Sequence, residues 1–172
     1  MINSKSAVAS VLRTLQKNNL PLDKIVLHKF LYFLNTQGVS TGLSFEPYTY
    51  GPFSFDLARV LSDMAFWDEI KENKASYEIL TLDSHPALNP DVEKQISDLL
   101  KKFQGIVGDF TFDNLESVGT ALYCAESIKF QGDRPTQERV VSEFKKWKGE
   151  RYPTARIQEV YDKLTPYIWH TP

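Results

Sequence analysis

The sequence has few of the residues from which catalytic and metal sites are built. Cys124 is the single cysteine among 172 residues, so an internal disulfide is impossible and a cytoplasmic location is expected. The three histidines, His28, His85 and His170, lie in different segments and lack the spacing typical of a zinc site. We therefore expect no metal and no cofactor, and we expect Cys124 to be a small buried side chain rather than a nucleophile.

Two further absences limit the classes of function. No stretch approaches the roughly 20 apolar residues of a membrane-spanning helix, and the first residues lack the apolar segment of a signal peptide. Residues 105–108 contain two glycines but neither the lysine nor the preceding strand of a phosphate-binding loop. We expect no membrane partner, and an enzyme has no support beyond His28, which could act as a general base. A bonded residue at the edge of the core is the simpler interpretation of His28.

Charge is distributed unevenly, although the net charge is only −2. Residues 1–40 carry five Lys/Arg and one acid, whereas residues 41–100 carry four Lys/Arg and eleven acids. Residues 101–172 carry eleven and ten, so the middle of the chain is its acidic part. An acidic segment repels phosphate groups, and this one therefore favours a basic protein partner or none over nucleic acid.

The apolar residues recur mostly at helical spacing, which predicts a mainly α fold. Helices are expected at residues 4–18, 22–36, 53–64, 90–107, 113–131, 136–148 and 154–165. A turn is expected at residues 72–76 and a strand at 77–82, and Asp113 with Glu116 has the spacing of a capping box. We expect a single domain over residues 1–172, in which three helices and a small hairpin in winged-helix order are followed by about four packed helices.

The stretch Tyr48-Thr49-Tyr50-Gly51-Pro52-Phe53-Ser54 is the most distinctive motif in the sequence. Its alternating tyrosines predict a short extended segment, which Gly51-Pro52 should end in a turn, and Phe53 should then open the packed face of the next helix. Tyr50 and Gly51 are expected to pack this turn against the second helix. Tyr48 and Phe53, if exposed, would be apt anchors of a protein interface.

The helix after this motif presents Asp56, Arg59 and Asp63 at i, i+3 and i+7 on one outward face. A DNA-recognition helix gains affinity from Lys/Arg contacts with phosphate, so two carboxylates beside one arginine disfavour that role. Basic residues 145–151 form a cluster, but Glu143 and Glu150 bracket it. Protein binding is the better interpretation, although a solvated surface is the default for any such charge run. Our candidate partner-binding residues are Glu46, Tyr48, Phe53, Asp56, Arg59, Asp63, Asp68 and Glu69.

Several of these segments resemble a known family. Lys29-Phe30-Leu31-Tyr32, followed by residues 48–54, is similar to the K-x-x-Y … Y-x-Y-G-P-[FY]-S pattern of the YwgA-like and Panacea (SocA-like) antitoxin domains. Ser117-Val118-Gly119-Thr120-Ala121 and residues 144–152 resemble the YwgA-like group, notably the C-terminal region of DarG antitoxins. The similarity extends over about residues 22–165.

The resemblance implies an antitoxin that neutralises a protein toxin by binding it directly. For the DarG type the toxin is DarT, which ADP-ribosylates DNA using NAD, and the antitoxin also has a macrodomain that removes the modification. These 172 residues resemble no macrodomain, so reversal of the modification is not expected of them. The acidic charge adds the hypothesis that Glu46, Asp56, Asp63, Asp68 and Glu69 imitate phosphates in the DNA-binding groove of the toxin. A winged-helix DNA-binding regulator is the alternative, and the identity of the toxin stays open, as does whether the chain is part of a longer antitoxin.

Overall fold

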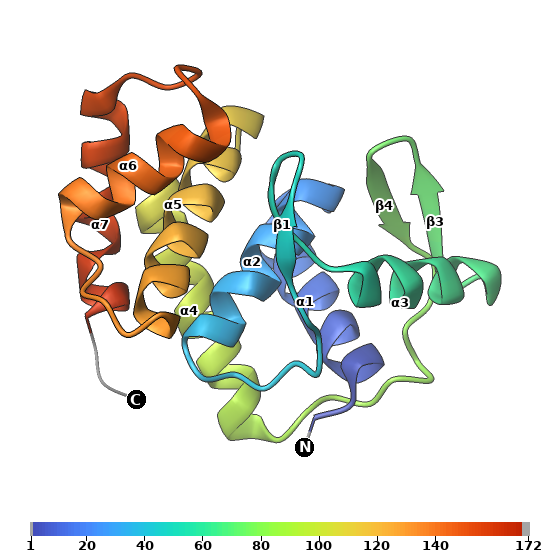
Figure 1. Ribbon diagram of the computed structural model, residues 1–172. Coiled ribbons are helices and arrows are strands. Elements are labelled where there is room, and N and C mark those ends of the chain that lie inside the picture. The colour runs from blue at the N-terminus through green and yellow to red at the C-terminus, as the bar shows by residue number, and fades with distance from the viewer. Residues whose placement is uncertain (1, 170–172) are drawn as a thin grey trace.

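The computed structural model describes residues 2–169, which form a mainly helical fold with two small β-hairpins (Figure 1). The helices are α1 (Ser4–Lys17), α2 (Lys24–Thr36), α3 (Phe55–Phe66), α4 (Pro90–Val107), α5 (Phe112–Phe130), α6 (Gln137–Lys148) and α7 (Thr154–Ile168). The strands are β1 (Glu46–Tyr48), β2 (Gly51–Phe53), β3 (Ile70–Asn73) and β4 (Ser76–Ile79). The prediction of a mainly α fold with several packed helices is confirmed.

Helices α2 and α5 form the centre of the core. Residues 26–34 of α2 are all buried, and α5 packs against α2 on one side and against α6 and α7 on the other (Figure 1). The rings of Phe30 and Phe33 each lie 5.3 Å from the ring of Phe103 on α4. A fully buried side chain of this size contributes about 2 kcal/mol, so this cluster holds α2 firmly in place.

The first hairpin differs from the prediction for residues 48–54. Gly51 and Pro52 do not end a strand but belong to β2, which pairs antiparallel with β1 so that Pro47 faces Pro52. Proline is tolerated here because a two-stranded hairpin leaves one side of each strand without a ladder partner. Gly51 follows the two-residue turn with φ of 106°, a conformation that favours glycine. Phe53 consequently lies on β2 rather than on α3, and α3 begins after Ser54, whose Oγ accepts the Leu57 N–H at 3.0 Å.

The second hairpin is attached to the start of α2. Its turn lies at residues 74–75, and β4 ends at Ile79, earlier than the expected strand. The N–H of Lys24 donates to the Ala75 carbonyl at 2.8 Å, and the N–H of Tyr77 donates to the Leu22 carbonyl at 2.9 Å. Both hairpins therefore rise beside the first turns of α2, one on either side (Figure 1).

None of the helices within residues 2–169 combines the length and apolar character that a membrane crossing requires.

Candidate functional site

A buried lysine joins α2, the first hairpin and α5. Lys29 is 3% exposed, and its Nζ donates to the carbonyl of Pro52 at 3.0 Å. Its side chain crosses α5 at Gly119, where an added Cβ would lie 2.9 Å from Lys29 Cδ. Burial lowers the pKa of Lys29 to about 7, as does the positive charge of Lys148, while Glu116 acts in the opposite direction.

Replacing Gly119 with alanine should lower the free energy of unfolding by about 1 kcal/mol, because overpacking outweighs the better helix propensity of alanine. The new methyl group would meet Lys29 Cδ at 2.9 Å and Pro52 Cδ at 3.3 Å. Gly105 on α4 is the matched control. Beyond its chain neighbours and the backbone of its own helix, no atom of residues 2–169 lies within 4 Å of its added Cβ, so Gly105→Ala should stabilise the protein by about 1 kcal/mol. Urea unfolding measures both variants. Equal stability of the two would contradict the tight packing at Gly119.

A buried carboxylate lies near this lysine. Glu116 on α5 is 1% exposed, and its Oε1 accepts hydrogen bonds from Arg151 Nε at 2.6 Å and from the Tyr152 hydroxyl at 2.7 Å. Lys148 Nζ lies 3.5 Å from Glu116 Oε2 and donates to the carbonyl of Thr49 in the hairpin turn at 2.6 Å. Burial raises the pKa of the Tyr152 hydroxyl, and burial lowers that of Lys148. The network therefore ties the turn of the first hairpin to α5 and α6.

The capping box predicted from Asp113 and Glu116 is wrong. Thr111 is the N-cap of α5, and its hydroxyl accepts the N–H of Asn114 at 3.2 Å. Glu116 thus lies inside the helix, free to point toward Arg151.

The segments that carry the family resemblance meet at this place. They are Lys29 on α2, residues 48–54 of the first hairpin, residues 117–121 of α5, and residues 144–152 of α6 and the following loop. These segments are far apart in the chain, and the contacts of Lys29 and Lys148 join them.

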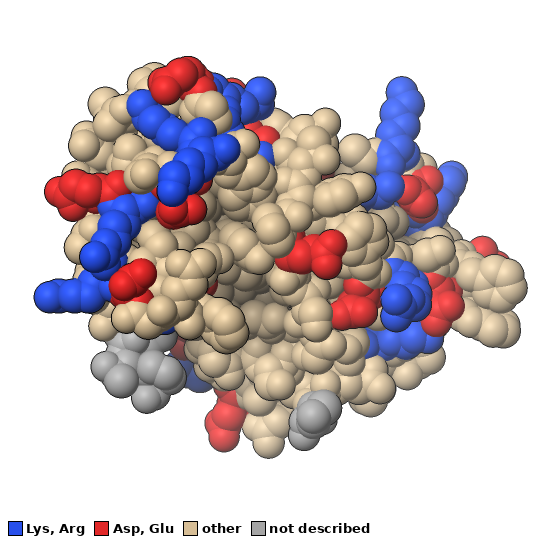
Figure 2. All heavy atoms as spheres, viewed as in Figure 1, with Lys and Arg blue, Asp and Glu red and all other residues tan. Residues whose placement is uncertain are grey.

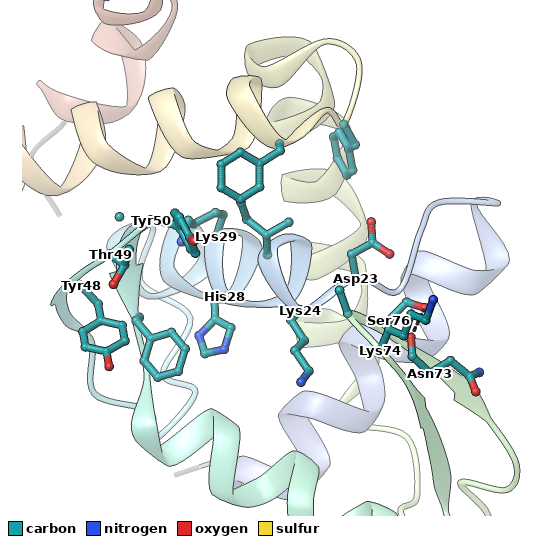
Figure 3. A pocket seen from close by; sticks show the side chains of 16 residues that line it. Asp23, Lys24, His28, Lys29, Tyr48, Thr49, Tyr50, Asn73, Lys74 and Ser76 are labelled. Carbon is teal, nitrogen blue, oxygen red and sulfur yellow. Dashed lines mark hydrogen bonds between the residues drawn. The ribbon is translucent and has the colours of Figure 1, made fainter. Parts of the chain in front are cut away.

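A pocket of about 660 Å³ opens beside this network, between the two hairpins and the start of α2 (Figure 3). Its walls are largely apolar and include the aromatic side chains of Tyr50, Phe53, Phe110 and Phe112. The volume falls within the range of small-molecule and peptide pockets, roughly 300–1,000 Å³. The pocket is therefore large enough to enclose one or two large side chains of a partner.

Aromatic side chains line this pocket and extend to the surface beside it. Tyr48 is 50% exposed and its ring lies 5.1 Å from that of Phe53, which in turn lies 4.9 Å from the ring of Phe55. Tyr50 is 54% exposed and contacts the ring of Phe112 on α5 at 5.0 Å. Tyr50 thus projects to the surface instead of only packing the turn. We call Tyr48, Tyr50, Phe53, Phe55 and Phe112 the aromatic rim.

His28 fastens the end of the first hairpin to α2. Its ring stacks on Phe53 with centroids 4.2 Å apart, and its Nδ1 accepts the N–H of Ser54 at 3.1 Å. Burial lowers the pKa of His28 to about 3, and the charges of Lys29 and Lys24 contribute. The imidazole is thus neutral, as a bonded residue at the edge of the core should be.

The candidate residues on α3 are partly engaged by other groups. Asp63 pairs with Lys5 of α1 at 2.8 Å. Asp56 accepts the N–H of Ser44 at 3.0 Å and lies 3.7 Å from the guanidinium of Arg59. On the face shown in Figure 2, acidic and basic side chains accordingly alternate over α3.

The remaining candidate acids come from two segments, β1 and the connection between α3 and β3. Oε2 of Glu69 lies 2.8 Å from Nε2 of His85, and His85 belongs to the loop after β4. Glu46 is exposed on β1, near the aromatic rim, and Asp68 is exposed in the turn after α3. The structure therefore places Glu46 with Tyr48 and Phe53 but does not bring the five carboxylates together as one array.

The basic cluster near the end of α6 is balanced by carboxylates. Lys145 pairs with Glu150 at 3.3 Å, and Lys146 pairs with Glu143 at 3.0 Å. Arg151 lies 3.1 Å from a carboxylate oxygen of Asp113. The cluster thus offers phosphate groups much less charge than the sequence alone suggests.

Within residues 2–169, no three His, Cys, Asp or Glu side chains lie together so that they could hold a metal ion. Cys124 is buried in α5, where burial raises the pKa of its thiol to about 12, and His170 lies outside the described residues. No protein-family model matches the chain, and no curated protein matches it either. The function must therefore be argued from the site.

Proposed function

We propose that this chain is a toxin-neutralising antitoxin module that binds its toxin directly through the aromatic rim. The observation that carries the proposal is the aromatic rim, in which four of the five side chains are 41–54% exposed and four line a preformed pocket of about 660 Å³. Tyrosine and other large aromatic residues supply much of the binding energy at protein interfaces, and clustered exposure of such residues typically marks an interaction surface. The family resemblance supplies the class of partner, a toxin, with a DarT-like DNA ADP-ribosyltransferase as the specific expectation.

The rim is held rigidly, which favours binding. Lys29, Lys148 and His28 each make a hydrogen bond to the backbone of residues 49–54. A surface that is already ordered loses little conformational freedom when a partner binds, so more of the contact energy appears as affinity.

Two other functions receive less support from the same site. DNA mimicry needs a row of free carboxylates, whereas Asp56, Asp63 and Glu69 are engaged by neighbouring groups. A winged-helix regulator needs a basic recognition surface, and α3 exposes Arg59 beside two acids. We therefore assign the contact to the rim, and we place the module in the cytoplasm with its toxin.

Co-expression with a toxic DarT-like DNA ADP-ribosyltransferase tests the proposal. Wild-type protein should restore growth to a bacterial host arrested by the toxin. Tyr50→Ala combined with Phe112→Ala should abolish the rescue and weaken the purified complex by about tenfold or more, because both rings are hot-spot candidates. Isothermal titration calorimetry measures the affinity.

Phe130→Ala is the matched control for the rim variant. Phe130 is 94% exposed at the other end of α5, about 27 Å along the helix from Phe112. Its loss should leave growth rescue and affinity unchanged. Full rescue by the rim variant would reject the rim as the contact. A complex that instead fails with Asp56→Lys, Asp63→Lys and Asp68→Lys would restore the mimicry hypothesis.

A further inference from the structure

The pocket between the hairpins is lined by aromatic side chains and by lysines. Its lining includes three lysines, Lys24, Lys29 and Lys74, and one acid, Asp23. Figure 3 shows Lys24 and Lys74 on the side formed by the start of α2 and the second hairpin, while Tyr50 lies on the opposite side. The two sides of the pocket are thus chemically different.

Two of these lysines, Lys24 and Lys74, are accessible to a bound group, whereas Lys29 is buried. Lys74 lies in the turn between β3 and β4, is exposed, and has no ion pair among residues 2–169. Lys24 pairs with Glu72, but both side chains are more than two-fifths exposed. Such a surface pair contributes typically less than about 1 kcal/mol, so a ligand carboxylate can replace Glu72 at low cost.

We propose that the pocket binds an acidic segment of the partner protein, with one large apolar side chain between the aromatic walls and flanking carboxylates on Lys24 and Lys74. This inference rests on the proposed function, because it describes the part of the toxin that the rim holds. The apolar anchor would lie beside Tyr50, Phe53 and Phe112, where it gains affinity from burial. The lysines would add selectivity for negative charge at the edge of the pocket.

A single strand of nucleic acid is the competing occupant, since aromatic rings and lysines also bind stacked bases. A nucleic-acid backbone needs a basic groove that continues beyond the stacking site. Here Asp23 lines the pocket and Glu72 lies beside Lys24. Acids near the pocket would repel a chain of phosphates, whereas a peptide can place its two or three carboxylates on the lysines alone.

A synthetic peptide tests this inference on the full chain. The probe is a blocked decapeptide with a central tryptophan between two pairs of glutamates. It is titrated into the ¹⁵N-labelled protein, and binding is followed by NMR. The largest changes in amide chemical shift should occur at the start of α2, in both hairpins and near Phe110 and Phe112. Lys24→Glu combined with Lys74→Glu should weaken binding about tenfold, whereas Lys101→Glu with Lys102→Glu, exposed residues of α4, should not.

The same peptide with lysines in place of its glutamates should bind at least about tenfold more weakly. Equal binding of the two peptides, shifts outside the pocket, or no binding of the acidic peptide at about 1 mM would overturn the inference. Displacement of the acidic peptide by a deoxythymidine decamer would assign the pocket to nucleic acid instead. Growth rescue that survives the two lysine changes but fails with the rim variant would reject the acidic segment and keep the proposed function. Rescue that survives the rim variant would reject the proposed function itself.

Discussion

Replacing Glu116 with alanine should lower the free energy of unfolding by about 3 kcal/mol. The carboxylate is 1% exposed and accepts hydrogen bonds from Arg151 and Tyr152, with the Lys148 ammonium 3.5 Å away. Without it, Lys148, whose side chain is 6% exposed, keeps the Thr49 carbonyl as its acceptor among residues 2–169. The large effect arises because removing one partner leaves a buried charge without its counter-charge, which costs more than the intact pair contributes.

Thermal unfolding followed by circular dichroism measures this loss, and the Tm should fall by on the order of 10 °C. Glu143→Ala is the matched control, because Glu143 makes a surface ion pair with Lys146 and its loss should change stability by less than about 0.5 kcal/mol. Glu116→Gln keeps an acceptor oxygen for the Tyr152 hydroxyl. Its loss of stability should therefore lie between those of Glu116→Ala and Glu143→Ala. If Glu116→Ala and Glu143→Ala unfold at the same temperature, the buried network does not stabilise the fold.

The loss of Glu116 should also weaken partner binding at the aromatic rim. Lys148 donates to the Thr49 carbonyl, and Thr49 stands between the two tyrosines of the aromatic rim. A Lys148 ammonium that turns toward solvent to regain hydration would release this turn. Partner affinity of Glu116→Ala, measured below its Tm, should therefore fall although Glu116 itself is buried and cannot touch the partner.

The helices could be predicted from the sequence because their signals are local. Apolar residues at helical spacing mark the buried faces, and Asn89 and Thr136, which are residue types that favour the N-cap, cap α4 and α6. The first hairpin could not be predicted in the same way. Its strands have three residues each, and all three residues of β1 are exposed, so no alternation of apolar and polar residues identifies them. Gly51-Pro52 also has the composition of a strand terminator.

The site was less predictable, because its contacts join residues far apart in the chain. Lys29 is a lysine inside an almost wholly apolar helix, and it is the first residue of the K-x-x-Y pattern, but neither signal identifies the groups that it contacts. Its acceptor Pro52 is 23 residues away, and Glu116 lies 35 residues from Arg151, so tertiary packing alone determines these pairs. The net charge of a sequence segment also does not predict an acidic surface. Asp63 belongs to the acidic segment, and yet it pairs with Lys5 of α1.

Lowering the pH from 7 to 4 should destabilise the wild-type protein by about 3 kcal/mol more than it destabilises His28→Gln. Burial, with the nearby charges of Lys29 and Lys24, lowers the pKa of His28 from 6.5 to about 3 in the folded protein. Between these values the unfolded chain binds a proton at this position and the folded chain does not. Stability is therefore lost as the pH falls through 6.5 and continues to fall until about pH 3.

The geometry around His28 also predicts that protonation of the imidazole destabilises the fold, independently of the pKa. Nδ1 of His28 accepts the N–H of Ser54 at 3.1 Å, and the ring stacks on Phe53, so protonation of Nδ1 would replace an acceptor with a donor facing a donor. The first hairpin should then detach from α2. In an NMR titration, the amide of Ser54 should lose its protection from hydrogen exchange at a higher pH than amides of the α5 core.

Urea unfolding at pH 7 and pH 4 separates this effect from the titration of carboxylates. Aspartate and glutamate side chains titrate in both proteins and cancel in the difference, so the remaining slope belongs to position 28. His28→Gln will itself be less stable at pH 7, because it loses the stacking on Phe53, but the comparison uses the change with pH rather than the absolute value. Parallel pH dependence of the two proteins would mean that the imidazole takes up its proton without breaking the contact between α2 and the hairpin. The rim would then owe its rigidity to Lys29 and Lys148 alone.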